Sequence, residues 1–375
     1  MLKSIKTLKK LLLIITASIL SAVFFIPVDF YQANSLCLTI IAKDKIYEYS
    51  RAEIGIYNGK YYLKNAREIV DGIYLDTIKR SQDASVKFVP NTDEKFFYTN
   101  EVIGEEICKE DLLENISLSL NSGVKKIQAK FKKTYPKITV ENVKNENNYR
   151  VRFTTYYNSS NDNRKHNIKL ASCKINGYIL DKNQEFSFNS VVGVRNEENG
   201  FLPAKIIFNG DYVEGVGGGV CQVSTTLYNV ALLSGLKITE HHPHSLQVGY
   251  IEPSFDAMVN SYTSDLKFIN NTGAKIYISS MADNEKITIT IYGEKQKESY
   301  KRVSVKLEEK TCIDYIYEED ENLNENIIVR YPKGELKSEG YLIKYENGKR
   351  VSNVKIRTDN YSEIKGIMKI PKPSS

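Results

Sequence analysis

The stretch GGGVCQVSTTLYNVALLSGLKITEHHPHS, residues 217–245, decides how the sequence is interpreted. Its three successive glycines indicate a backbone with positive φ or a close approach of other groups. Apolar residues then recur at helical spacing from Val223 to Ala231, and Gly235 is typical of the residue that ends a helix. Cys221 is therefore predicted at the N-terminus of a helix, where exposed N–H groups and the helix dipole favour a thiolate.

Three of the four histidines follow this predicted helix. A helix of about 13 residues carries the chain about 20 Å away from Cys221. The next segment is predicted to be extended, and eight or nine residues at about 3.3 Å each return about 28 Å. His244 then comes level with Cys221, and Asp256 is available to orient the imidazole. The spacing predicts a Cys–His pair.

Other interpretations of these residues stay open. Cysteine is among the residues most often buried for packing alone. Cys221, His242 and His244 would offer a metal site, because alternating residues of a strand share a face, but no acidic ligand is evident. The glycine turn lacks the Lys-Ser/Thr of a phosphate-binding loop. We therefore predict neither a metal nor a cofactor.

The N-terminus predicts a membrane segment. Four lysines within the first ten residues precede an uncharged run over residues 11–28, which would be about 27 Å long as a helix. Positive residues stay on the cytoplasmic side, so the chain beyond residue 30 is expected outside the cytoplasm, anchored by one membrane pass. A cleaved signal peptide, giving a secreted or cell-wall protein, is the alternative.

Composition narrows the class of protein. A length of 375 residues fits two or three domains, and 41% hydrophobic residues exclude a wholly disordered chain. The net charge of +6 is too weak and diffuse to predict nucleic-acid binding. The five cysteines are widely spaced without a CxxC pair, which excludes a zinc ribbon and a disulfide scaffold. Their odd number leaves at least one thiol outside any disulfide within the chain.

The predicted fold class is α+β, in a membrane-anchored multidomain chain. Four regions follow one another: an N-terminal anchor or signal (1–30), a small α+β module (38–147), a mixed α/β domain with one main helix against strands (150–295), and a β-rich module (300–370). Helices are predicted after Asn65 and from Lys109 to Leu120. Asn-Gly pairs at residues 58–59 and 347–348 predict hairpin turns.

The central region carries a resemblance to a known family. Its motifs occur in this order: FTTYYNSSNDNRKHNIKLASCKINGYIL, FSFNSVVGVR, GGGVCQVSTTLYN, HHPHS, DAMV and DLKFINNTG. Together they resemble the VanW family, named for an accessory protein of vancomycin-resistance clusters, over about residues 150–295. Residues 96–143 resemble a peptidoglycan-binding-like module, and the last 70 residues resemble the β-rich G-five module, which is linked to cell-wall binding.

The resemblance implies an envelope protein of a Gram-positive bacterium, with peptidoglycan or another cell-wall glycan as its partner. The family implies no settled reaction. Six residues fall on family motif positions: Cys221, Gln222, Ser224, Thr225, His244 and Asp256. Two positions depart from the pattern, because Lys182-Asn183 replaces a Pro-Gly turn and Ser254 replaces a glycine.

Two functions remain open at this point. The first is a protein that binds or organises the cell wall without turnover. The second is a cysteine-dependent amidase or transpeptidase-like enzyme, with Cys221 as nucleophile, His244 as base, Asp256 as its orienting group and Gln222 in the oxyanion hole with helix N–H groups. Ligand contacts are expected from the glycine turn, Ser224, Thr225 and His242; the turn comprises Gly217, Gly218 and Gly219.

Overall fold

The computed structural model describes residues 37–208 and 210–372, so the predicted anchor at residues 1–30 lies outside the described residues. None of the helices in the described part of the chain is long and apolar enough to cross a membrane. The chain divides into two compact units: residues up to 84 with 100–139, and residues 85–99 with 140 onwards. The predicted module borders differ from this division, since residues 85–99 and the C-terminal strands belong to the second unit.

The first unit is a small α+β fold. Its elements are β1 (Leu38–Ala42), β2 (Lys45–Tyr49), β3 (Ile54–Tyr57), β4 (Lys60–Leu63), α3 (Ala66–Thr77), β7 (Gly104–Ile107), α4 (Lys109–Ser122), β8 (Lys126–Gln128) and β9 (Phe131–Thr134). Alternate residues of β1 are buried against both helices, as expected for a strand with one apolar face. The predicted helices are confirmed, and Gly123 ends α4 in the left-handed conformation.

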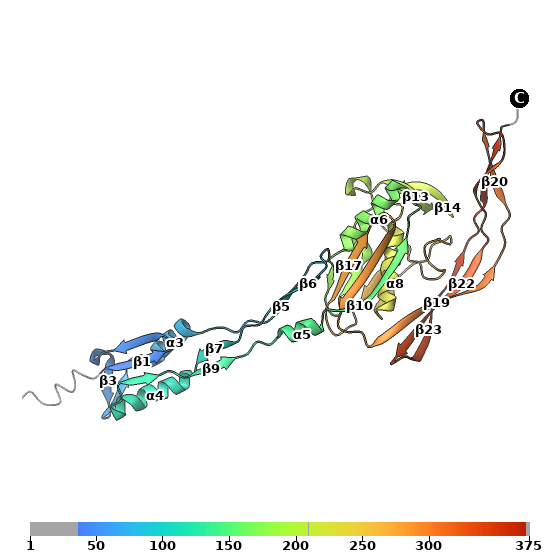
Figure 1. Ribbon diagram of the computed structural model, residues 1–375. Helices are drawn as coiled ribbons and strands as arrows, with labels where there is room; N and C mark the ends of the chain where they lie inside the picture. The colour runs from blue at the N-terminus through green and yellow to red at the C-terminus, as the bar shows by residue number, and fades with distance from the viewer. Residues whose placement is uncertain (1–36, 209, 373–375) are drawn as a thin grey trace, which may run out of the picture. The chain divides into compact units, whose positions relative to one another are not determined.

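The core of the second unit is a four-stranded antiparallel sheet covered by two helices. The strands run in the order β10 (Asn148–Tyr156), β18 (Lys286–Gly293), β17 (Ile276–Ala282) and β11 (Ile179–Leu180). Helices α6 (Asp162–Ile175) and α8 (Val220–Leu233) pack against this sheet and against each other (Figure 1). Ile287, Ile289 and Ile291 of β18 are fully buried in the resulting core.

Strand β17 has buried residues on both faces. The hairpin of β5 (Ser85–Phe88) and β6 (Phe96–Thr99) brings Phe88 and Phe96 against Tyr277 and Tyr292, with ring centroids 5.2 to 6.3 Å apart. These aromatic contacts explain why the hairpin joins the second unit rather than the first.

The expectation of one main helix in the central domain is wrong, because α6 is as long as α8. Ile168, Ala171 and Ile175 form its buried stripe, while charged residues between them obscure the apolar period. The Asn161 side chain accepts from the Arg164 amide and caps the helix start. The α+β fold class itself is confirmed.

Shorter elements complete this part of the second unit. They are α5 (Val140–Asn145), β12 (Glu185–Ser187), α7 (Phe188–Val192), β13 (Pro203–Phe208), β14 (Asp211–Val216), β15 (Lys237–Glu240) and β16 (Lys267–Ile269). Strands β13 and β14 pair as an antiparallel hairpin, and β12, β16 and β15 form a separate three-stranded sheet.

The C-terminal strands form two three-stranded sheets. The first contains β19 (Glu298–Glu309), β22 (Leu336–Glu346) and β23 (Lys349–Tyr361); the second contains β20 (Tyr315–Asp320), β24 (Gly366–Pro371) and β21 (Ile327–Arg330). The predicted turn between β22 and β23 is confirmed, because Asn347 and Gly348 both have positive φ.

The two departures from the family pattern keep a left-handed backbone. Asn183 has φ 62° and Ser254 has φ 65°. Asparagine tolerates this conformation readily, whereas serine adopts it at a cost of about 1–2 kcal/mol. Ser254 is fully buried, and its hydroxyl lies 2.7 Å from that of Ser338, which holds the loop in place. All five cysteines are free thiols.

Candidate active site

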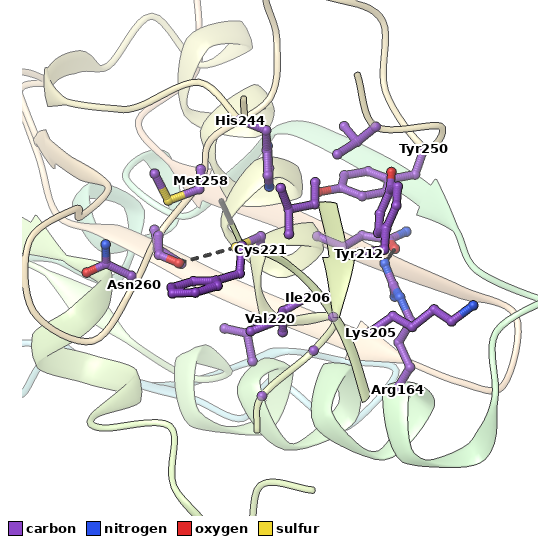
Figure 2. A pocket seen from close by; sticks show the side chains of 18 of the residues that line it. Arg164, Lys205, Ile206, Tyr212, Val220, Cys221, His244, Tyr250, Met258 and Asn260 are labelled. Atoms are coloured by element: carbon purple, nitrogen blue, oxygen red, sulfur yellow. Dashed lines mark hydrogen bonds between the residues drawn. The ribbon is translucent and has the colours of Figure 1, made fainter. Parts of the chain in front are cut away.

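Cys221 lies in the first turn of α8, at the wall of a cavity of about 1040 Å³. Gly219 caps this helix with φ 107°, a conformation that a side chain would strain. The β13–β14 hairpin and the segments around residues 243–250 and 258–261 complete the cavity wall. Figure 2 shows the Cys221 side chain in this cavity, where its Sγ lies 3.3 Å from the Val259 carbonyl oxygen.

The buried His244 and Asp256 complete a chain of three side chains that begins at the partly buried Cys221. Strand β15 returns along α8, and the His244 ring points toward Cys221 (Figure 2). His244 Nδ1 lies 2.7 Å from Asp256 Oδ2, and the His244 amide donates to the same oxygen at 2.6 Å. Because Nδ1 faces the carboxylate, Nε2 is the nitrogen left for the thiol. The structure therefore brings together the three residues that the sequence predicts.

The electrostatics favour a charged Cys–His pair. Desolvation raises the Cys221 pKa, but the hydrogen bond and charge of His244 outweigh it, and the net shift is downward. Desolvation lowers the His244 pKa, but hydrogen bonds with Asp256 and Cys221 raise it to about 9. Desolvation raises the Asp256 pKa, but the hydrogen bond and charge of His244, together with the charge of Arg357, outweigh it and lower the pKa to about 2. At neutral pH these values leave His244 as imidazolium and Asp256 as carboxylate, and the lowered Cys221 pKa favours the thiolate.

The C-terminal sheet supplies the partners for the second oxygen of Asp256. Arg357 Nη2 and the Tyr361 hydroxyl, both on β23, donate to Asp256 Oδ1, the hydroxyl at 2.7 Å. The Tyr361 oxygen also accepts from the Ser254 amide at 2.7 Å. Asp256 is 1% exposed, so each of these hydrogen bonds offsets a desolvation cost. The predicted β-rich module thus contributes directly to the geometry of the site.

Gln222 does not occupy the predicted oxyanion hole. Its side-chain amide donates to Thr155 Oγ1 and to the Tyr156 carbonyl, both at 3.0 Å, and its oxygen accepts from Arg164. The backbone N–H of Val220 donates to the Gly217 carbonyl, and the N–H of Gln222 donates to the Gly219 carbonyl. With both side-chain hydrogens engaged, Gln222 instead fixes the position of Arg164.

Ser224, Thr225 and His242 do not line the cavity, contrary to the expected ligand contacts. The Ser224 hydroxyl donates to the Ala257 carbonyl at 2.6 Å, and Thr225 Oγ1 accepts from the Ala257 amide at 2.9 Å. His242 Nε2 lies 3.0 Å from Glu240 Oε1. Ser224 and Thr225 therefore fasten α8 to the segment that carries Asp256.

The metal alternative finds no support in the described residues, where no group of three or more His, Cys, Asp and Glu side chains is arranged to hold an ion. His242 is engaged with Glu240 and does not reach the cavity that Cys221 and His244 line.

Sequence reasoning missed three residues beside the thiol, namely Arg164, Arg195 and Tyr250. Arg164 comes from α6, Arg195 follows α7, and both act on Cys221 through their charge. The Tyr250 pKa is raised by burial and by the charge of Cys221. The only sequence signal was that both arginines lie within the motifs that carry the family resemblance.

Comparison with known proteins matches this domain to one family. The family model described as VanW like protein matches residues 163–292. The protein YoaR of Bacillus subtilis is 34% identical over 192 residues, which cover 51% of this chain and 63% of YoaR. The vancomycin B-type resistance protein VanW of Enterococcus faecalis is 28% identical over 149 residues, covering 38% of this chain and 54% of that protein.

The chain thus spans less than two thirds of the length of both relatives. No solved structure matches. The matched residues contain both core helices, the glycine turn, Cys221, His244 and Asp256, which are the parts that build the site. Through residues 163–292 the chain is thus similar to the VanW like family, as its two relatives also indicate.

Proposed function

We propose that the chain is a cell-envelope enzyme that uses Cys221 to cleave or exchange peptide amides of peptidoglycan, as an amidase or a transpeptidase. The observation that carries the proposal is the chain from the partly buried Cys221 through the buried His244 to Asp256, at the wall of a large cavity. A nucleophile, its base and a group that orients the base are the parts that acyl transfer requires. The envelope location is inferred from the relative named for vancomycin resistance and from the N-terminal sequence.

The reaction proceeds in two balanced steps. The Cys221 thiolate attacks the amide carbon, the C–N bond breaks, and the leaving amine takes the proton of the His244 imidazolium. This step leaves a thioester on Cys221 and a neutral His244. An incoming amine or water then gives a proton to His244 as it attacks the thioester, which restores the thiolate and the imidazolium. Asp256 keeps the ring oriented throughout and stabilises the positive charge whenever His244 is protonated.

The test compares the unmodified chain with Cys221→Ala and Cys221→Ser on purified peptidoglycan fragments, with products identified by mass spectrometry. We expect both variants to lose at least about 10³-fold in rate, while circular dichroism remains unchanged. The unmodified chain should show a transient mass increase equal to the acyl group. The proposed enzyme activity would be refuted if Cys221→Ala formed products as fast as the unmodified chain, or if the unmodified chain formed none.

Wall binding without turnover is the second candidate. One observation favours it: the first unit has its own core, yet every residue that lines the cavity belongs to the second unit. A separate role for the first unit is then needed, and attachment to peptidoglycan would suit it. Co-sedimentation with purified cell walls measures this role. Binding that persists in Cys221→Ala, with no products from the unmodified chain, would favour this candidate over the enzyme.

A further inference from the structure

The cavity beside Cys221 carries unbalanced positive charge. Arg164, Arg195 and Lys205 line it, and none of its described lining residues is Asp or Glu. A concave surface of one sign attracts ligands of the opposite sign, and more strongly where water is partly excluded. The charge therefore points to an anionic group on the ligand.

Arg164 is held without a carboxylate partner among the described residues. Its Nη2 donates to the Gln222 side-chain oxygen at 3.0 Å, while its Nη1 is buried and has no hydrogen-bond partner. Desolvation lowers its pKa, which shows the cost of keeping this charge out of water. Figure 2 shows the side chain rising from α6 toward Tyr212 and Tyr250, on the cavity side of the helix. A partly buried guanidinium with a free N–H and no anion beside it is a suitable receptor for one.

Arg195 also has only neutral acceptors among its hydrogen bonds. Its guanidinium donates to the Asn189 side-chain oxygen at 2.6 Å and to the Asn260 carbonyl at 3.3 Å. The nearest acidic influence is Asp265, whose carboxylate is occupied by the Ser187 hydroxyl and the Asn189 amide. The Asp265 charge still acts on Arg195, but no carboxylate among the described residues accepts a hydrogen bond from its guanidinium.

The glycine turn explains how both arginines come so close to Cys221. A Cβ at Gly217 would lie 2.9 Å from Arg195 Cβ, and a Cβ at Gly219 would lie 2.9 Å from Arg164 Cγ. Such distances are below van der Waals contact, so both positions need glycine for space as well as for their positive φ. The turn brings one arginine stem to each side of the helix start that carries the thiol.

We propose that Arg164 and Arg195 form a carboxylate subsite beside Cys221, so that the reacting peptide carries a free carboxylate close to the amide under attack. The identity of the reaction rests on the proposed function, whereas recognition of a carboxylate does not. A simpler alternative is that the two arginines only stabilise the thiolate. The two roles differ in one respect: a carboxylate subsite distinguishes anionic from neutral reagents.

Alkylation of the full chain with iodoacetate and iodoacetamide separates these roles. Both reagents form an S–C bond and release iodide, but only iodoacetate carries a carboxylate. Site-resolved mass spectrometry gives the iodoacetate-to-iodoacetamide rate ratio at Cys221 and, as an internal reference, at the exposed Cys173. We expect a ratio about tenfold higher at Cys221 than at Cys173, and a decline of this preference with added salt.

The variants Arg164→Gln and Arg195→Gln should each lower the ratio at Cys221 by about threefold or more. If Arg164→Gln does not fold, Arg164→Lys replaces it and tests the guanidinium geometry with the charge kept. The salt dependence of the ratio is measured on the unmodified chain and needs no variant. Lys205→Gln is the matched control, because Lys205 is exposed at the same cavity and should change the ratio less than twofold.

Each outcome has a distinct meaning. Equal ratios at Cys221 and Cys173, or an equal loss of both rates in the arginine variants, would overturn the carboxylate subsite and leave the proposed enzyme intact. Failure of Cys221 to react with either reagent at neutral pH would instead contradict the proposed function.

Discussion

Two cysteines of this chain stand at the start of a helix, one in each unit, and their surroundings differ. Cys108 is the N-cap of α4, whose first turn contains Glu110 and Asp111. Cys221 lies in the first turn of α8, which has no acidic residue there, and it faces His244 and two arginines. Both helix starts offer the same dipole, so the added charges, rather than the helix, are what would distinguish the proposed nucleophile Cys221 from Cys108.

The largest effect is expected from His244→Ala. A thiol with the ordinary pKa of about 8.5 is only about 0.3% thiolate at pH 6, so loss of the imidazolium should slow alkylation of Cys221 at pH 6 by about 100-fold. The rate at Cys221 would then approach the rate at Cys108, measured in the same sample by mass spectrometry. His242→Ala is the matched control, because His242 does not line the cavity. Equal alkylation rates of Cys221 and Cys108 at pH 6 in the unmodified chain would show that the charges around Cys221 do not activate its thiol.

A smaller effect is expected from Asp256→Asn. The carboxylate holds the His244 pKa at about 9, so its loss should shift that pKa down toward 6.5. The imidazolium donates a proton to the leaving amine, and this form is lost as pH rises through the His244 pKa. The decline of turnover, near pH 9 in the unmodified chain, should therefore occur at lower pH. Alkylation of Cys221 should fall about tenfold near pH 7.5, where most of His244 would then be neutral.

The same variant removes one of the two carboxylates, Asp256 and Asp359, that pair with the buried Arg357, and the free energy of unfolding should fall by about 3 kcal/mol. Urea unfolding measures this change. A variant that is destabilised but keeps the original pH profile would show that Asp256 supports the fold without acting on His244.

The centre of this site follows from regular geometry. The rise per residue of a helix and of a strand is fixed, so the length of α8 and the return through β15 suffice to bring His244 to Cys221. Asp256 was expected as the orienting group, and its hydrogen bond to His244 agrees with that. The helices of the first unit were equally predictable, because apolar period and a terminal glycine mark them locally.

The missed parts depend on contacts between distant segments. Arg164 is 57 positions before Cys221, and only the packing of α6 on α8 brings them together. The glycines signalled a close approach but not the identity of the approaching group. Gln222 was misassigned for the same reason, since its partners Thr155 and Tyr156 lie on β10. Charge patterns in sequence do not reveal which arginine stays without a carboxylate.

The smallest effect is expected from Tyr361→Phe, which tests how far the C-terminal strands sharpen the contrast between the two cysteines. The change removes the hydrogen bonds of the hydroxyl with Asp256 and with the Ser254 amide, and should lower the free energy of unfolding by about 1–2 kcal/mol. Arg357 still pairs with Asp256, so the carboxylate stays charged and alkylation of Cys221 near pH 7.5 should fall less than about threefold. Tyr341→Phe on β22 is the control, because its hydroxyl contacts Glu339 away from the site. If the variant is less stable but the alkylation rate of Cys221 is unchanged, the role of Tyr361 is limited to holding the Ser254 loop. If the alkylation rate falls as much as in Asp256→Asn, Tyr361 is essential for orienting the Asp256 carboxylate.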